Sequence, residues 1–89
     1  MTSSKALVDL LHSLAERNVQ SKGMTLARGS GWLIPDNGHP IGYWHGYYWW
    51  PSGRLREGRP VYAIHPANDP AGAARRITAA RQSPQVLSL

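Results

Sequence analysis

An aromatic stretch in the middle of the chain decides the fold: residues 43–54, Tyr43-Trp44-His45-Gly46-Tyr47-Tyr48-Trp49-Trp50-Pro51-Ser52-Gly53-Arg54. Residues 43–50 favour an extended strand, because Trp and Tyr have high strand propensity. Side chains alternate along a strand. One face is therefore predicted to carry Tyr43, His45, Tyr47 and Trp49, and the other Trp44, Tyr48 and Trp50. Both faces of this strand are expected to be aromatic, whichever of them is buried.

Turn signals on both sides of this stretch divide the middle of the chain into three strands. Pro35-Asp36-Asn37-Gly38 contains Asn-Gly, the pair that favours a type I′ hairpin turn. Trp50-Pro51-Ser52-Gly53 has the Pro and Gly spacing of a type I turn. We expect strands over about 25–34, 41–50 and 59–65, within a sheet region of about 24–65, paired as an antiparallel meander.

Amphipathic helices are predicted at both ends. The first, over about 3–17, has Ser3 or Ser4 as its cap and an apolar stripe of leucines: Leu7, Leu10, Leu11 and Leu14. The second, over about 69–82, begins with Asn68 or Asp69 as cap and Pro70 at its first position. The tail, 83–89, has little pattern. We predict a single α+β domain over 1–89, a three-stranded antiparallel sheet flanked by N- and C-terminal helices (αβββα), with both helices on one sheet face.

The composition and the apolar pattern indicate the compartment in which we expect the protein. Ten Lys and Arg against five Asp and Glu give the 89 residues a formal charge of +5, and the absence of Cys excludes disulfides and thiolate sites. Charged residues interrupt the apolar pattern near the N-terminus, so no secretory signal is expected. The longest apolar run is far shorter than the roughly 20 residues of a membrane span. We expect a cytoplasmic protein that makes no membrane contact, and we leave its oligomeric state open.

Arginine is concentrated in the last third of the chain. Residues 54–81 carry a net charge of +4 through six arginines: Arg54, Arg56, Arg59, Arg75, Arg76 and Arg81. The planar guanidinium matches phosphate oxygens in a bidentate manner, and a positive field attracts nucleic acid. The pattern favours these six residues as nucleic-acid contacts. An acidic protein partner, or charge that only solvates the surface, is the alternative.

The aromatic strand supplies a second set of candidate residues. Tyr43, Tyr47 and Trp49, if uncovered beside arginine, can stack on unpaired bases at roughly 1–3 kcal/mol per base. The alternative is that these rings build the core, because the chain has no Phe. His45 is predicted to lie within the strand among the rings, which distinguishes it from the other three histidines as a candidate for chemistry. Its alternative is a strand histidine without chemistry.

The sequence has no pattern for a metal ion or a cofactor, and we expect neither. No two of the four histidines have ligand spacing on one element, and Cys is absent. The five acidic residues are too dispersed to form a carboxylate pair. Gly29-Ser30-Gly31 lacks the lysine and the following helix of a phosphate-binding loop. A nuclease built on this chain would therefore have to be metal-independent.

Several local motifs, in this order, resemble the HicA-type mRNA interferase toxins. SSKALVDLLHSL, residues 3–14, is similar to the first helix of that family, and His45 lies six residues before Pro51, where the family has a catalytic strand histidine ahead of a Pro-x-Gly turn. VYAIHPANDPAGAARRITAARQ, residues 61–82, resembles the third strand and last helix, with matching positions at His65, Gly72, Arg75 and Ile77. The resemblance spans most of residues 3–82. The family's Gly-Ser-His is Tyr43-Trp44-His45 here.

The resemblance implies a double-stranded-RNA-binding-domain-like fold and a role in toxin–antitoxin systems. The expected protein contacts RNA, in preference to DNA, either as a divergent metal-independent ribonuclease toxin or as a non-catalytic relative. In the catalytic version His45 acts on a ribose hydroxyl while arginines hold phosphates. Two other interpretations stay open. One is a phage or mobile-element accessory protein that binds and inhibits a host protein, and the other is a small DNA-binding protein. An acidic antitoxin or host protein is the corresponding protein partner.

Overall fold

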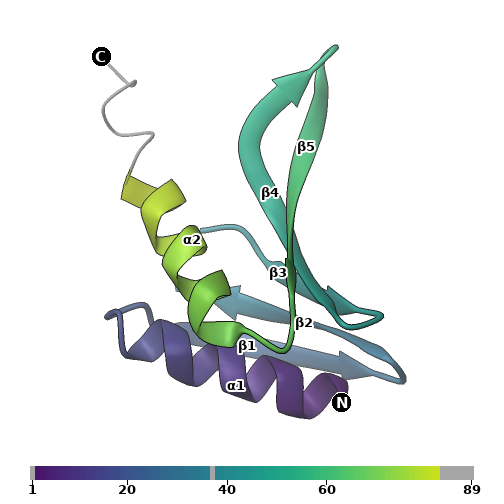
Figure 1. Ribbon diagram of the computed structural model, residues 1–89, viewed down its shortest axis with the longest axis vertical. Helices are drawn as coiled ribbons and strands as arrows, with labels where there is room; N and C mark the ends of the chain where they lie inside the picture. The colour runs from purple at the N-terminus through teal and green to yellow at the C-terminus, as the bar shows by residue number, and fades with distance from the viewer. Residues whose placement is uncertain (1, 37, 83–89) are drawn as a thin grey trace.

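Two helices cover one face of a five-stranded antiparallel sheet in the computed structural model, which describes residues 2–36 and 38–82 (Figure 1). The elements follow each other as α1 (Ser3–Ala15), β1 (Ser21–Ala27), β2 (Ser30–Pro35), β3 (Ile41–Trp44), β4 (Tyr47–Arg56), β5 (Arg59–Pro66) and α2 (Pro70–Gln82). The strands lie in sequence order, and each is antiparallel to the next. The predicted α+β class, with an antiparallel sheet between two terminal helices, is confirmed.

The predicted number of strands is wrong, because two of the three expected strands each contain a tight turn. Arg28-Gly29 connects β1 to β2, and Ala27 pairs directly with Ser30. His45-Gly46 connects β3 to β4, and Trp44 pairs with Tyr47. Each turn uses a glycine in the left-handed region, with φ of 77° at Gly29 and 82° at Gly46. Glycine adopts this conformation without a steric penalty, so it turns the chain where propensity alone predicts continued extension.

The turn predicted over residues 50–53 is a β-bulge inside β4. The pairing register shifts between Pro51 and Arg54, and Gly53 has a φ of 85°. The chain reverses further on, at Glu57-Gly58, where both residues have positive φ. At the other predicted turn, the chain passes from β2 to β3 through residues 36–40, a connection longer than a two-residue turn. Asn37 itself lies outside the described residues.

The helices begin close to where capping chemistry predicts. Thr2, not Ser3 or Ser4, caps α1, and its hydroxyl oxygen accepts a hydrogen bond from the Lys5 amide. Asp69 caps α2, since a carboxylate oxygen accepts from the Gly72 amide at 3.1 Å. Pro70 is the first helical residue, as expected. The helix α1 ends at Ala15, two residues before the predicted end, and the tail 83–89 lies outside the described residues.

The core lies between the helices and one face of the sheet. Leu7, Leu10 and Leu14 from α1 and small residues from α2 pack against strand residues that point toward the helices: Leu33, Ile41, Tyr43, Tyr48 and Trp50. The Tyr48 hydroxyl donates a hydrogen bond to the backbone oxygen of Ala6 in α1. This bond satisfies the polar end of a ring that is otherwise surrounded by apolar atoms.

Part of the sheet extends past the helices. The strands β4 and β5 project beyond α2 as a curved two-stranded ribbon (Figure 1). We call residues 52–61 of this ribbon the arm; its residues from Gly53 to Pro60 are exposed.

None of the helices described here is long and apolar enough to cross a membrane.

Candidate functional site

The sheet face that the helices leave uncovered is lined by aromatic side chains. Trp44, Tyr47 and Trp49 lie on this face, because the two-residue turn at His45-Gly46 places Trp44 directly opposite Tyr47. Trp44 is 59% exposed and Tyr47 is 50% exposed. The prediction that Tyr47 and Trp49 share a face is therefore correct. The predicted companions of this pair are wrong: Tyr43 is buried on the helix side, and Trp44 belongs to the uncovered face.

A row of paired residues crosses this face and brings two tryptophans into contact. Trp32 pairs with Gly42, Gly42 with Trp49, and Trp49 with Ile64. The Trp49 ring lies over Gly42, so closely that a Cβ there would be 2.5 Å from the indole. Because Gly42 has no side chain, Trp49 reaches the Trp32 ring edge-on, at 4.6 Å between centroids. Tyr62 meets the Trp49 ring at 5.5 Å, also edge-on. Such edge-to-face contacts hold the rings in fixed positions.

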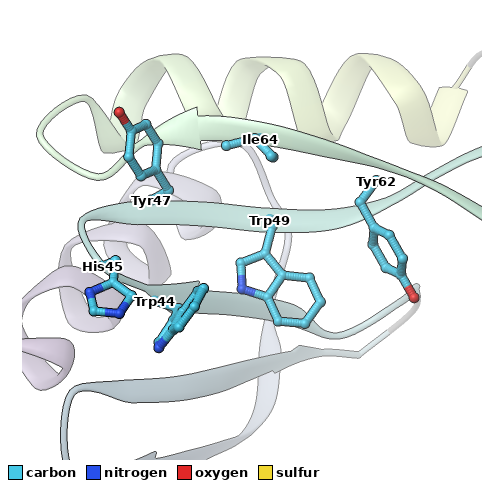
Figure 2. Close-up of a pocket in the computed structure, with 6 residues that line it drawn as sticks. All are labelled: Trp44, His45, Tyr47, Trp49, Tyr62 and Ile64. Atoms are coloured by element: carbon cyan, nitrogen blue, oxygen red, sulfur yellow. The ribbon is translucent and has the colours of Figure 1, made fainter.

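An open hollow of about 600 Å³ lies beside the Trp49 and Tyr62 rings (Figure 2). Its walls come from the end of β3, the turn that follows, β4 and β5, through the residues Trp44, His45, Tyr47, Trp49, Tyr62 and Ile64. The lining is almost entirely carbon surface. Because several of its large side chains are about half exposed, the hollow offers flat apolar surfaces to a ligand without rearrangement of the core.

His45 stands at the end of the hollow, in the turn between β3 and β4, and not within a strand as predicted. Its φ of 49° lies in the left-handed region, which histidine tolerates better than most residues. The imidazole is exposed and lies 4.1 Å from the Trp44 ring between centroids. Among the described residues, no side chain forms a hydrogen bond or an ion pair with it. His45 is therefore accessible to a ligand but is not oriented by a carboxylate.

A second, more polar hollow adjoins the aromatic one, and Trp44 and His45 form part of both walls. It has a volume of about 670 Å³ and lies between the start of α1, the β1–β2 turn and the β3–β4 turn. Arg28, from the β1–β2 turn, is the cationic side chain in its lining. The sequence prediction omitted Arg28, because this arginine lies outside the basic last third of the chain.

The predicted arginines lie in two separate places. Arg54, Arg56 and Arg59 belong to the arm. Arg54 pairs with Val61, and Arg56 pairs with Arg59, so these three arginines share one side of the ribbon. Leu55 and Pro60 pair on the opposite side, the side of Tyr62 and the aromatic rings. The register thus brings the three arm arginines together, but on the other side of the ribbon from the predicted stacking residues.

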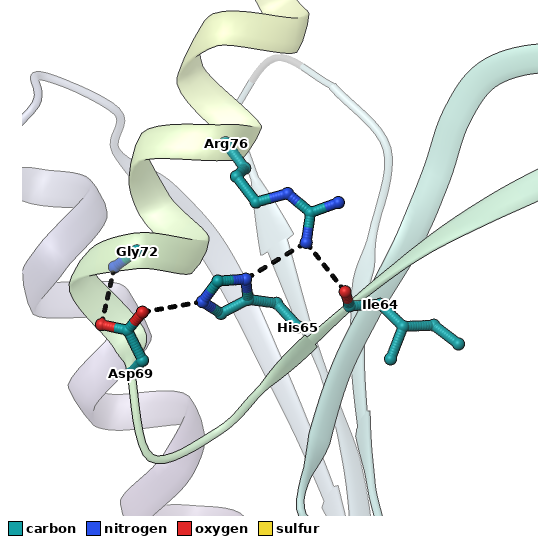
Figure 3. Close-up of polar contacts among 5 residues, drawn as sticks. All are labelled: Ile64, His65, Asp69, Gly72 and Arg76. Carbon is teal, nitrogen blue, oxygen red and sulfur yellow. Dashed lines mark hydrogen bonds and ion pairs between the residues drawn. The ribbon is translucent and has the colours of Figure 1, made fainter.

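The remaining arginines lie in α2, and one of them has a structural role (Figure 3). Arg76 donates to the backbone oxygen of Ile64 at 2.8 Å and to Nδ1 of His65 at 3.1 Å, and its guanidinium lies over the Trp50 ring. Nδ1 of His65 accepts this bond, so Nε2 carries the proton that is donated to Asp69 at 2.9 Å. Arg76 therefore fastens α2 to β5. Arg75 is exposed, and the side chain of Arg81 lies outside the described part of the structure.

The same network lowers the pKa of the Asp69 carboxyl. The hydrogen bond from His65 is the largest cause, followed by the hydrogen bond from the Gly72 amide, since both favour the ionised form. Asp69 is thus a charged cap at the N-terminus of α2, where the helix dipole also favours a negative charge.

The residues that the structure describes contain no group of three His, Cys, Asp or Glu side chains that could hold a metal ion.

The candidate site consists of the uncovered aromatic face, the polar hollow with Arg28, and the arm. Trp32, Trp44, Tyr62 and Ile64 belong to it although the sequence analysis did not predict them as site residues. Gly46, as a turn signal inside the aromatic stretch, could have assigned Trp44 to this face. The chain matches no family model, no curated protein and no solved structure.

Proposed function

We propose that the protein binds single-stranded RNA, and that unpaired bases stack on its uncovered sheet face. The observation that carries this proposal is a solvent-facing set of rings within a basic protein: Trp32, Trp44, Tyr47, Trp49 and Tyr62. None of the five acidic residues lies within a strand, so the face has no carboxylate that would repel a phosphate backbone. Stacking on such rings contributes roughly 1–3 kcal/mol per base.

Charge supports the choice of a nucleic acid over a protein partner. A nucleic acid brings an apolar base and an anionic phosphate together, and the molecule offers an apolar hollow next to a polar one that contains Arg28. The formal charge of +5 attracts such a ligand over distance. The preference for RNA over DNA, and a cytoplasmic location, follow the resemblance to the mRNA interferase toxins.

We propose binding without cleavage, as in a non-catalytic relative of those toxins. Metal-independent cleavage of RNA needs a group that removes a proton and a group that supplies one. Apart from His45, the aromatic hollow is lined by Trp, Tyr and Ile side chains, and no described carboxylate or second histidine lines any hollow that His45 borders. His45 is thus suited to stacking or hydrogen bonding next to Trp44.

The test is the affinity of the purified protein for a fluorescently labelled 12-nucleotide RNA of mixed sequence. Trp44→Ala should weaken binding roughly ten- to a hundredfold, corresponding to about 1–3 kcal/mol, whereas Trp44→Tyr keeps a ring and should retain most of the affinity. Binding should also weaken steeply between 50 and 200 mM salt. Absence of binding, or an affinity that Trp44→Ala leaves unchanged, would refute the proposal.

Two further results would redirect it. Cleavage of the labelled RNA by the wild type but not by His45→Ala, with exposed His12→Ala as the control, would establish the ribonuclease interpretation. A DNA strand of the same sequence that binds as tightly would remove the RNA preference. Tight binding to a protein that changes little with salt, together with no RNA binding, would favour the inhibitor of a host protein.

A further inference from the structure

The arm carries three guanidinium groups that are not used within the fold. Arg54, Arg56 and Arg59 are exposed, and their side chains form no ion pair or hydrogen bond with any other described residue. Arg76 in α2 is the opposite case, because two hydrogen bonds and the Trp50 ring hold its guanidinium. The arm arginines are thus available to a ligand.

The arrangement of these arginines is unfavourable unless an anion is bound. Arg56 and Arg59 are direct cross-strand partners, and like charges in that position destabilise a two-stranded ribbon. Glu57, the acidic residue of the turn between them, forms no ion pair with either side chain. Arg54, two residues before Arg56 on the same side, adds a third charge. A phosphate group between these side chains would convert the repulsion into charge-assisted hydrogen bonds.

The backbone of the arm is fixed before any ligand arrives. The Ser52 hydroxyl donates to the backbone oxygen of Val61 at 2.6 Å and joins the two strands at the bulge. The hydroxyl oxygen of Ser52 also accepts a hydrogen bond from the Arg54 amide at 3.3 Å. At the far end, Glu57 and Gly58 both have the positive φ of a tight hairpin turn. The three arginines therefore project from a defined ribbon and not from a loop.

The tip of the arm is too far from the rings around Trp49 to contact the same nucleotide, and Arg54, which lies opposite Val61 and close to Tyr62, is on the other side of the ribbon from the hollow. Arg56 lies seven residues beyond Trp49 along β4, or roughly 20 Å at about 3.3 Å per residue. A ligand that reaches both places must therefore continue past the stacked bases. It must also pass from one side of the ribbon to the other, which is only two strands, about 5 Å, wide.

We infer that the arm is a second, separate contact, which binds phosphates of the nucleotides that flank the stacked bases. This inference rests on the proposed function, and it defines the ligand as a strand long enough to occupy both places at once. Two linked contacts bind more tightly than either alone, because the second contact forms at a high effective concentration. Affinity should therefore rise sharply when the strand becomes long enough to reach the arm.

The experiment compares RNA strands of 4 and 12 nucleotides, with the triple variant Arg54→Gln, Arg56→Gln, Arg59→Gln. In the wild type we expect the 12-nucleotide strand to bind at least tenfold more tightly than the short one. The triple variant should lose at least tenfold in affinity for the long strand and less than threefold for the short one. The slope of log affinity against log salt concentration should become shallower by about 2 in the triple variant, since each lost phosphate contact to a single strand removes about 0.7 from the slope. Arg17→Gln, beyond the end of α1, is the matched control and should change neither strand.

Three outcomes would overturn the inference. An equal loss for both lengths would mean that the arm contributes only a diffuse positive field. No loss for either length would mean that it does not contact RNA. If neither strand binds the wild type, the proposed function itself fails, and the arm loses its ligand with it. Circular dichroism of the triple variant verifies that the sheet is intact, which is expected because all three side chains are exposed.

Discussion

Tyr47 and Tyr48 are consecutive, chemically identical residues of β4, yet they lie on opposite sides of the sheet. Tyr47 is 50% exposed on the uncovered face, whereas Tyr48 is fully buried beneath the helices and bonded to α1. Trp49 and Trp50 repeat the contrast, with Trp49 among the rings of the open hollow and Trp50 under the guanidinium of Arg76. One side of the sheet thus uses Trp and Tyr for stability, and the other side presents the same residue types to solvent.

The difference shows that residue type alone does not assign a role to these rings. Register assigns it, and the turn at His45-Gly46 sets the register. A face that served only as surface would not need Trp and Tyr, since polar side chains satisfy an exposed strand face. The contrast between the two faces can be tested by matched substitutions, and the expected effects follow from the largest to the smallest.

The largest contrast is expected between Tyr48→Ala and Tyr47→Ala. Removal of the buried ring leaves a cavity and should lower the free energy of unfolding by about 3–5 kcal/mol, whereas removal of the exposed ring should change it by less than about 1 kcal/mol. RNA affinity should show the reverse pattern in Tyr47→Ala, with a stable fold and weaker binding. Urea unfolding followed by circular dichroism measures the first quantity. Similar losses of stability in both variants would contradict the assignment of faces.

Gly42 should be sensitive to the smallest possible enlargement. The new methyl group of Gly42→Ala would meet the Trp49 indole at 2.5 Å, so the ring must move and lose its contacts with Trp32 and Tyr62. We expect a loss of about 1–3 kcal/mol in unfolding free energy, as for other overpacked positions, and weaker RNA binding. Gly23→Ala is the control, because its methyl group would meet its nearest neighbour, Ile34, at an ordinary 3.7 Å. Equal behaviour of the two variants would refute the role of Gly42.

Tyr48 should also make the fold sensitive to alkali. Burial, followed by the nearby charge of Asp9, raises the pKa of Tyr48 well above its usual value near 10. As the pH rises, the unfolded chain therefore loses this proton before the folded chain does. The contribution of Tyr48 to stability is thus fully present below pH 10 and is lost as the pH rises further. Tyr48→Phe removes the hydrogen bond and should lower the free energy of unfolding by about 1 kcal/mol at neutral pH. It also removes the hydroxyl that titrates, so the stability of this variant should fall less than that of the wild type at alkaline pH. Unfolding curves at pH 8 and 11 measure both effects, and a decline unchanged in Tyr48→Phe would disprove the cause.

The smallest effect is expected at the junction of β5 and α2. Because the pKa of the Asp69 carboxyl is lowered in the fold, its ionised form contributes stability above the unfolded value near 3.9, and this contribution is lost as the pH falls below it. Asp69→Asn keeps a capping oxygen but removes the charge, so its stability should depend less on pH between 5 and 2. Thermal unfolding across that range tests this; an acid dependence as steep as in the wild type would exclude Asp69 as a contributor.

The sequence was informative where one signal acted alone. The leucine stripe of α1, and Asp69 and Pro70 at the start of α2, correctly predicted both helices. The strands were harder, because strand propensity and turn signals overlap in the same residues. Aromatic residues on both sides of His45-Gly46 favour extension, but the glycine reverses the chain, and this single turn exchanged the faces of Tyr43 and Trp44.

The site was predictable only in part, for a related reason. Charge led to the prediction of Arg54, Arg56 and Arg59 as contacts, and alternation correctly predicted that Tyr47 and Trp49 share a face. Trp32 and Tyr62 join them only through pairing between strands, which a local pattern does not contain. Charge alone does not distinguish a ligand contact from a structural arginine. Arg76 was predicted as a nucleic-acid contact from its charge, but its hydrogen bonds to β5 and to His65 give it a structural role.

The hydrogen bond from Arg76 to Ile64 also makes one edge of the sheet less open to pairing with another chain. β5 is the last strand of the sheet, and an exposed edge of this kind invites pairing with a strand of another chain. Arg76 occupies the backbone oxygen of Ile64, while Pro60 and Pro66 near the two ends of β5 have no backbone N–H to offer. A blocked edge matters in a protein with so many exposed rings, because pairing of strands between chains would extend the sheet and bring the rings of several chains together.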